Sequence, residues 1–187
     1  MKTVCLTSFH GIISRNILQT PFLKKLQEHG VRIVLLVPEE KQERFEEVFG
    51  SAVDEIVGVA AEKKMAHEFV RLLSVSSISL ENLYVRRLYA NRQWGKVGVA
   101  WLSHLLGRFF WYLRFIRLLD RWLLTGSVAS RVLQEISPDL IFVTDLYSDL
   151  DKEMVKAAKK YGIYSVGMVR SWDNVTTKGV LRCIPDH

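Results

Sequence analysis

Three short loops carry most of the side chains that could take part in chemistry, and the first covers residues 8–16. His10 stands beside Gly11 in this loop, and Arg15 and Asn16 follow. An imidazole titrates near neutral pH, so His10 could take a proton from a substrate hydroxyl. Gly11 permits close ligand approach, and Arg15 could hold an anionic group with its planar guanidinium. The alternative is a loop histidine that bonds only to backbone.

The second loop, residues 144–149, contains Asp145 close after an apolar run. A carboxylate in this position could orient a base or bind a substrate hydroxyl, and a purely structural role is the alternative. Asp149 and Asp151 stand at the start of a predicted helix over 149–161, where carboxylates accept backbone N–H bonds. We therefore expect one of these two aspartates to cap the helix.

The third loop has the sequence RSWDNVTTKG, residues 170–179. An indole stacks on sugar rings or bases, amide and carboxylate groups bond ring hydroxyls, and cations neutralise phosphate. The alternative is a self-contained turn, since an Asp-Asn pair favours turns. The residues expected to contact substrate are Arg170, Ser171, Trp172, Asp173, Asn174, Thr176, Thr177 and Lys178.

The elements that must position these loops alternate between strands and helices. The predicted strands are residues 3–8, 32–37, 53–59, 139–144 and 163–169, and a helical insertion covers about 62–135. Alternating strands and helices predict an α/β fold with a parallel, Rossmann-like sheet. The carboxyl ends of such strands meet at one edge, where ligands bind. We therefore expect one site, with Trp172 and Asp173 facing His10.

The positive charge is concentrated in one part of the chain. The net charge is +6, but residues 86–131 hold nine basic residues and a single acid, Asp120, which gives +8 there and −2 elsewhere. This distribution indicates a local anionic partner rather than general affinity for nucleic acid.

A basic, aromatic helix is predicted within that segment. Arg114, Arg117 and Arg121 share one helical face, with Phe109, Trp111, Phe115 and Trp122 around it. Such a helix can lie in a membrane interface, and we expect the three arginines to contact anionic lipid. The longest uncharged run, residues 97–107, is far short of the ~20 residues that a span needs. The alternative is a helix packed on the sheet with a solvated arginine stripe.

The two cysteines, Cys5 and Cys183, lack the spacing of metal ligands, so we expect no metal site and a reducing, cytoplasmic location. The N-terminus has no secretory pattern.

The segments SFHGIISRNIL, TDLYSDLD and VRSWDNVTTKG, in this order, resemble a group of bacterial GT-B-type proteins linked to surface-carbohydrate assembly. These are distantly similar to CDP-glycerol glycerophosphotransferases and nucleotide-sugar epimerases. The resemblance implies an N-terminal Rossmann-like domain, residues 1–187, that holds the acceptor, while a C-terminal domain, absent from this chain, holds the donor. It also implies that His10 is the base, that residues 171–174 line the interdomain cleft, and that no cofactor is bound.

The expected function is the acceptor-binding half of a glycosyltransferase in bacterial surface polysaccharide or glycolipid synthesis, inactive without its donor domain. His10 would be the base, and Asp145 and Asp173 auxiliary carboxylates. The expected partners are a sugar or lipid-linked acceptor, a nucleotide-sugar donor and an anionic membrane surface, but no nucleic acid. The alternatives are half of a nucleotide-sugar 2-epimerase and a non-catalytic carbohydrate- or membrane-binding module.

Overall fold

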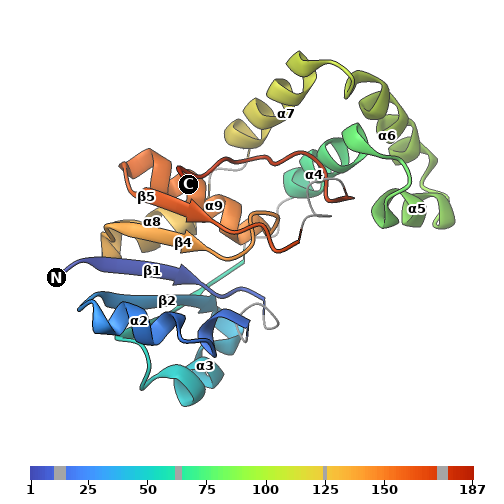
Figure 1. The fold of residues 1–187 in the computed structure, drawn as a ribbon. Helices are drawn as coiled ribbons and strands as arrows, with labels where there is room; N and C mark the ends of the chain where they lie inside the picture. Colours follow the sequence, from blue (N-terminus) through green and yellow to red (C-terminus); the bar gives the residue numbers. More distant parts are fainter. Residues whose placement is uncertain (11–15, 62–64, 124–125, 172–176) are drawn as a thin grey trace. The chain divides into compact units, whose positions relative to one another are not determined.

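The computed structural model describes residues 1–10, 16–61, 65–123, 126–171 and 177–187 (Figure 1). The chain divides into two compact units. The first, the sheet unit, comprises Met1–Glu62, Gly126–Met168 and Ile184–His187. The second, the helical unit, comprises Lys63–Thr125 and Val169–Cys183.

The sheet unit is built on five parallel strands in the order β3-β2-β1-β4-β5. The strands are β1 (Thr3–Thr7), β2 (Arg32–Pro38), β3 (Glu55–Val59), β4 (Leu140–Val143) and β5 (Tyr164–Gly167). This arrangement confirms the predicted α/β, Rossmann-like fold. The strand order runs outward from β1 to β3 and then returns to β4 on the other side of β1. The switch point of the sheet therefore lies between β1 and β4.

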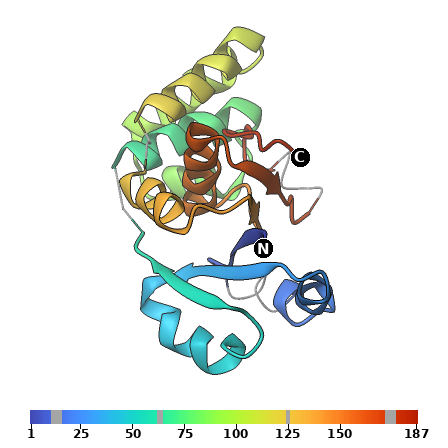
Figure 2. The ribbon, with the colours of Figure 1, turned by 90° about the vertical axis from the view of Figure 1, so that its left-hand side faces the viewer.

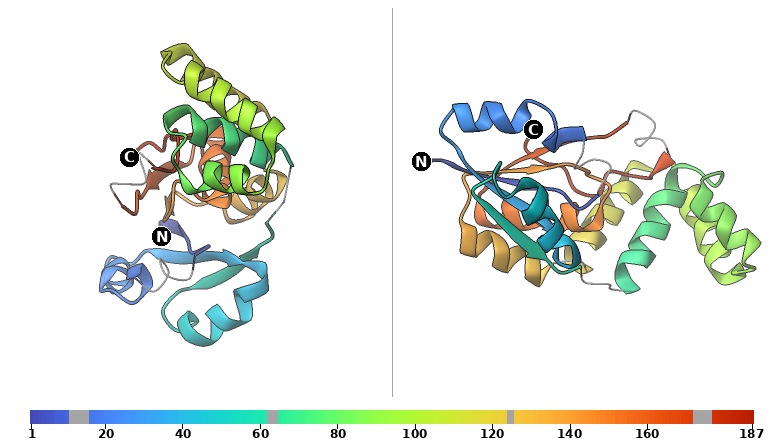
Figure 3. Two further views of the ribbon diagram at one scale, coloured as in Figure 1. Left: turned by 90° about the vertical axis from the view of Figure 1, so that its right-hand side faces the viewer. Right: turned by 90° about the horizontal axis from the view of Figure 1, so that it is seen from below.

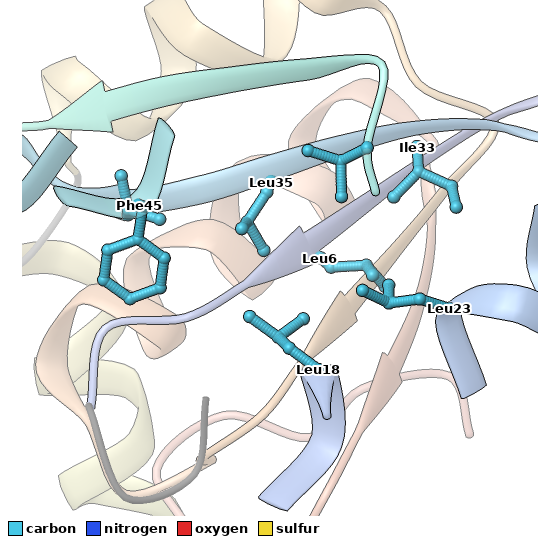
Figure 4. Close-up of a cluster of buried hydrophobic side chains, with 8 residues drawn as sticks. Leu6, Leu18, Leu23, Ile33, Leu35 and Phe45 are labelled. Carbon is cyan, nitrogen blue, oxygen red and sulfur yellow. The ribbon is translucent and has the colours of Figure 1, made fainter. Parts of the chain in front are cut away.

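Side chains of β2 alternate between two buried faces of the sheet, which explains its unbroken apolar sequence. Ile33 and Leu35 belong to a core cluster with Leu23 of α2 (Phe22–Glu28) and Phe45 of α3 (Gln42–Phe49) (Figure 4). A short 3-10 turn, η1 (Glu39–Lys41), precedes α3. The helices α2 and α3 thus cover one face together, as right-handed crossovers in one direction require.

The other face of the sheet is covered by α8 (Ser127–Ile136) and α9 (Asp149–Tyr161). The hydroxyl of Thr7 in β1 donates to the carboxylate of Asp151 in α9, which fixes α9 on this side. Figures 2 and 3 show α2 on the opposite side of the strands from α8 and α9.

The end of the chain runs along the free edge of β5. The amide of Gly167 donates to the carbonyl of His187 at 2.9 Å, and the amide of Asp186 donates to the carbonyl of Ser165 at 2.9 Å. The Asp186 carboxylate accepts from the amide and hydroxyl of Ser165, and these bonds lower the pKa of Asp186. Residues 184–187 therefore occupy a strand edge that would otherwise expose its backbone groups.

The helical unit contains α4 (Met65–Ile78), α5 (Leu83–Ala90), α6 (Trp94–Leu106) and α7 (Phe110–Leu123). One core cluster joins α4 to α7 through Val70, Leu73, Tyr112 and Ile116. A hydroxyl chain adds to it, because Tyr112 donates to Ser103 at 2.8 Å and Ser103 donates to the Leu73 carbonyl at 2.8 Å.

The segment downstream of the third loop is bound to these helices. Ser74 and Val180 exchange two hydrogen bonds, the amide of Val180 donating at 3.2 Å and the Ser74 hydroxyl donating at 3.0 Å. Arg117 donates from Nε to the Leu181 carbonyl at 3.0 Å. Arg182 pairs with Asp120 at 3.1 Å, with both side chains buried. Residues 180–182 are therefore held by α4 and α7.

The buried pair of Arg182 and Asp120 leads to a prediction about stability. Replacing Asp120 with Ala leaves a buried guanidinium without this carboxylate, so the free energy of unfolding should fall by about 3 kcal/mol. Urea unfolding followed by tryptophan fluorescence measures this, because Trp94, Trp101, Trp111 and Trp122 lie in the helical unit. The double variant Asp120→Leu/Arg182→Met should recover most of the loss. A single variant within ~1 kcal/mol of the parent would contradict the account.

Candidate functional site

The candidate site lies at the carboxyl ends of β1 and β4, on both sides of the switch point. After β1, Ser8 continues the sheet by donating its amide to the Leu36 carbonyl at 2.8 Å, and the chain then reaches His10. After β4 come Thr144 and Asp145, both buried. Because β1 and β4 are neighbours, residues far apart in the sequence meet at this edge.

His10 and Asp145 form the central pair of the site. Nε2 of His10 lies 3.8 Å from Oδ2 of Asp145, with the imidazole side chain 51% exposed and the carboxylate 2% exposed. That separation is too long for a hydrogen bond, so the pair is an ion pair when the imidazole is protonated. An exposed imidazole beside a buried carboxylate can accept a proton from a ligand while the carboxylate stabilises the resulting charge.

The backbone after β4 fixes the Asp145 carboxylate. Oδ1 accepts the amide of Tyr147 at 3.1 Å, and the Asp145 carbonyl accepts the amide of Ser148 at 2.9 Å. This turn directs Oδ2 toward His10. The pKa of the Tyr147 phenol is raised, first by burial and then by the charge of Asp145. The local sequence Asp-Leu-Tyr-Ser thus forms a rigid turn that positions a carboxylate.

A buried hydrogen-bond network lies beneath this pair. The Thr7 hydroxyl accepts the amide of Thr144 at 3.0 Å and donates to Oδ1 of Asp151. The second oxygen, Oδ2 of Asp151, is buried and has no hydrogen-bond partner among the residues that the structure describes. Burial is the main cause that raises the pKa of Asp151 to about 7, opposed by hydrogen bonds from Thr7 and Ser148. The network joins β1, β4 and α9 at the base of the site.

The predicted capping role of Asp149 or Asp151 is wrong. Ser148 is the N-cap of α9, and its hydroxyl accepts the amide of Asp151 at 3.5 Å. Asp149 instead pairs with Lys152 at 2.6 Å. Serine caps as well as aspartate does, and the cap position falls one residue earlier than predicted. Asp151 lies at helical spacing from the buried Met154, Val155 and Ala158, which is the sequence signal that places it on the core face.

The other residues predicted for the site have different outcomes. Asn16 is exposed in a helical turn over residues 16–18. The described residues of the third loop belong to the helical unit, and the expected single site for the first and third loops stays a prediction. The described residues of the third loop are Arg170, Ser171, Thr177 and Lys178. Six predicted residues lie outside the part of the chain that the structure describes, namely Gly11, Arg15, Trp172, Asp173, Asn174 and Thr176.

The three predicted membrane-contact arginines are not equivalent. Arg114 and Arg121 are exposed on α7, but Arg117 is only partly exposed and bonds to the Leu181 carbonyl. Membrane contact by the three arginines stays a prediction, and Arg117 has an intramolecular partner as well. The Leu181 carbonyl in segment 180–182 accepts a hydrogen bond from the Arg117 side chain. Local helical spacing could not indicate this contact, because Leu181 is distant in sequence.

Comparisons with known proteins add no family to this description. No model of a known protein family matches the chain, and no curated protein matches it.

Proposed function

We propose that the sheet unit binds a hydroxyl-rich acceptor, a sugar or a sugar-bearing lipid, at the carboxyl edge between β1 and β4. The observation that carries the proposal is the pair of His10 and Asp145 at the switch point of the sheet. Open α/β sheets bind their ligands at this position. The reaction class, transfer of a glycosyl group, rests on the resemblance of the three loop segments to GT-B-type proteins.

The chemistry proposed for His10 is general-base catalysis. An acceptor hydroxyl attacks the anomeric carbon of a nucleotide sugar, its proton passes to the imidazole, and the nucleotide diphosphate leaves. With Nε2 directed toward Asp145, the nitrogen that takes the proton is Nδ1. Asp145 then stabilises the imidazolium, because opposite charges within a few ångströms favour the charged form. Asp173 remains a proposed auxiliary carboxylate.

The proposed location is the cytoplasm, where nucleotide sugars and reduced thiols occur together. Cys5 and Cys183 are both buried, and burial raises the pKa of Cys5 to about 12. A buried thiol with a raised pKa, such as that of Cys5, is unreactive, which suits a reducing compartment.

Binding measurements on the full chain test the acceptor site. Saturation-transfer NMR with a panel of monosaccharides and sugar 1-phosphates should detect a bound sugar. Asp145→Asn should weaken that binding by about tenfold, because a buried carboxylate that positions the site is lost. Glu47→Gln, which removes an exposed carboxylate from α3, serves as the matched control. Equal binding by the two variants, or no sugar bound by the parent chain, would contradict the proposal.

A further inference from the structure

The helix α7 has two apolar faces, and only one of them is packed. Tyr112 and Ile116 are buried against the helical unit. On the neighbouring side of the helix, four large apolar residues recur at helical spacing and stay exposed, at 58%, 46%, 53% and 78%. These residues, here called the α7 stripe, are Trp111, Phe115, Leu118 and Trp122. A second apolar stripe on a helix indicates another contact, because exposed apolar patches of this kind mark interaction surfaces.

The charged side chains of α7 that border the α7 stripe are arginines. Arg114 and Arg121 are exposed along one side of the stripe, and the guanidinium of Arg114 lies over the Phe110 ring at 4.7 Å. The only acid in residues 86–131, Asp120, is buried and paired with Arg182. The surface around the stripe therefore offers arginines and no carboxylate from this segment. Its charge complements an anionic partner.

We propose that α7 lies along the surface of an anionic phospholipid bilayer, with the α7 stripe among the acyl chains and Arg114 and Arg121 at the headgroups. An aromatic stripe flanked by basic residues is the pattern of interfacial helices. A nucleic acid would require the basic groups at the centre of the contact rather than beside an apolar stripe. A second copy of the chain would bring two sets of arginines together, which like-charge repulsion opposes.

The length of α7 fits this orientation. Its 14 residues make it about 21 Å long, shorter than a hydrocarbon core of ~30 Å. Among the residues that the structure describes, no helix is long and apolar enough to cross a membrane. The contact resides in the helical unit and is independent of the acceptor site proposed for the sheet unit.

Vesicle flotation of the full chain tests the proposal. Vesicles of equal parts phosphatidylcholine and phosphatidylglycerol should bind the chain, whereas phosphatidylcholine alone should bind it much less. Arg114→Gln/Arg121→Gln should lower the partition constant by about 30-fold, since each basic residue near such a surface contributes ~1 kcal/mol. Arg86→Gln/Arg87→Gln removes two exposed arginines of the same segment from α5 and is the charge-matched control.

A second pair of variants tests the apolar part of the contact. Trp122→Ala should weaken binding to the anionic vesicles by about tenfold, because a large aromatic contact is lost. Trp94→Ala removes a tryptophan of α6 that is 64% exposed, and it should bind as the parent does. Both side chains are exposed, so neither replacement should disturb the fold.

Three outcomes would overturn the proposal. Equal losses in the two double-arginine variants would mean that total charge, not the α7 stripe, governs binding. Equal losses of vesicle binding in Trp122→Ala and Trp94→Ala would mean that the contact is not specific to the α7 stripe. Absence of vesicle binding together with a dimer, measured by light scattering and abolished by Trp122→Ala, would assign the stripe to a second copy.

Discussion

Asp151→Asn should stabilise the protein at pH 8 and have little effect at pH 4. The Asp151 side chain is fully buried, and burial raises its pKa to about 7, whereas the same group in an unfolded chain titrates near 3.9. The folded state therefore holds the proton more tightly than the unfolded state. The contribution of this group to stability is complete below about pH 4 and is lost as the pH rises through about 7.

The size of this effect follows from the separation of the two pKa values. A difference of about three pH units corresponds to roughly 4 kcal/mol of unfolding free energy, present at pH 4 and absent at pH 8. Asparagine resembles the neutral acid, so the variant should lack this pH dependence and gain stability of that order at pH 8. Urea unfolding at several pH values measures it, with Glu47→Gln as the exposed control. A variant less stable than the parent at pH 8 would show that Asp151 is charged and favourably bound.

His10→Ala should lower the turnover of glycosyl transfer by about 10²–10⁴-fold in an assay that contains a donor-binding domain. The loss should appear in kcat rather than in KM, because a base acts in the transition state. The rising acid limb of the pH–rate profile should also disappear. His29→Ala is the control, since the His29 ring bonds to the Lys25 carbonyl at 2.7 Å at the end of α2.

A structural role for His10 would give a different pattern. The variant would then lose unfolding free energy in proportion to its loss of activity, and the shape of its pH–rate profile would be retained. Such a result would reject His10 as the base while leaving the acceptor site itself open to the binding test.

The regular elements of the sheet unit were largely predictable because their apolar patterns are strong. The run RIVLLV predicts β2 over residues 32–37, and α9 covers the predicted residues 149–161. The third strand is shorter than predicted, Glu55–Val59, because Asp54 turns to accept the Ile33 amide at 2.7 Å with its carboxylate. Hydrophobic pattern determines the element, but single side-chain bonds determine its ends.

The candidate site was predictable only in part. The proximity of His10 and Asp145 follows from a general property of parallel sheets, that the carboxyl ends of neighbouring strands share an edge. The role of Asp151 was missed because a carboxylate in the first turn of a helix resembles a cap, and only the bond from Thr7, distant in sequence, shows otherwise. Arg117 illustrates the same limit, since its partner is Leu181.

An NMR titration of the full chain with the sugar that binds best tests the central claim most directly. The claim is that the acceptor lies at the carboxyl edge between β1 and β4. Backbone amide shifts should then concentrate at residues 8–10 and 144–148, and in Asp145→Asn they should need about tenfold more sugar to reach the same size. Shifts confined to the amino-terminal edge of the sheet, near Thr3 and Asp139, or to helices α4–α7, would contradict it.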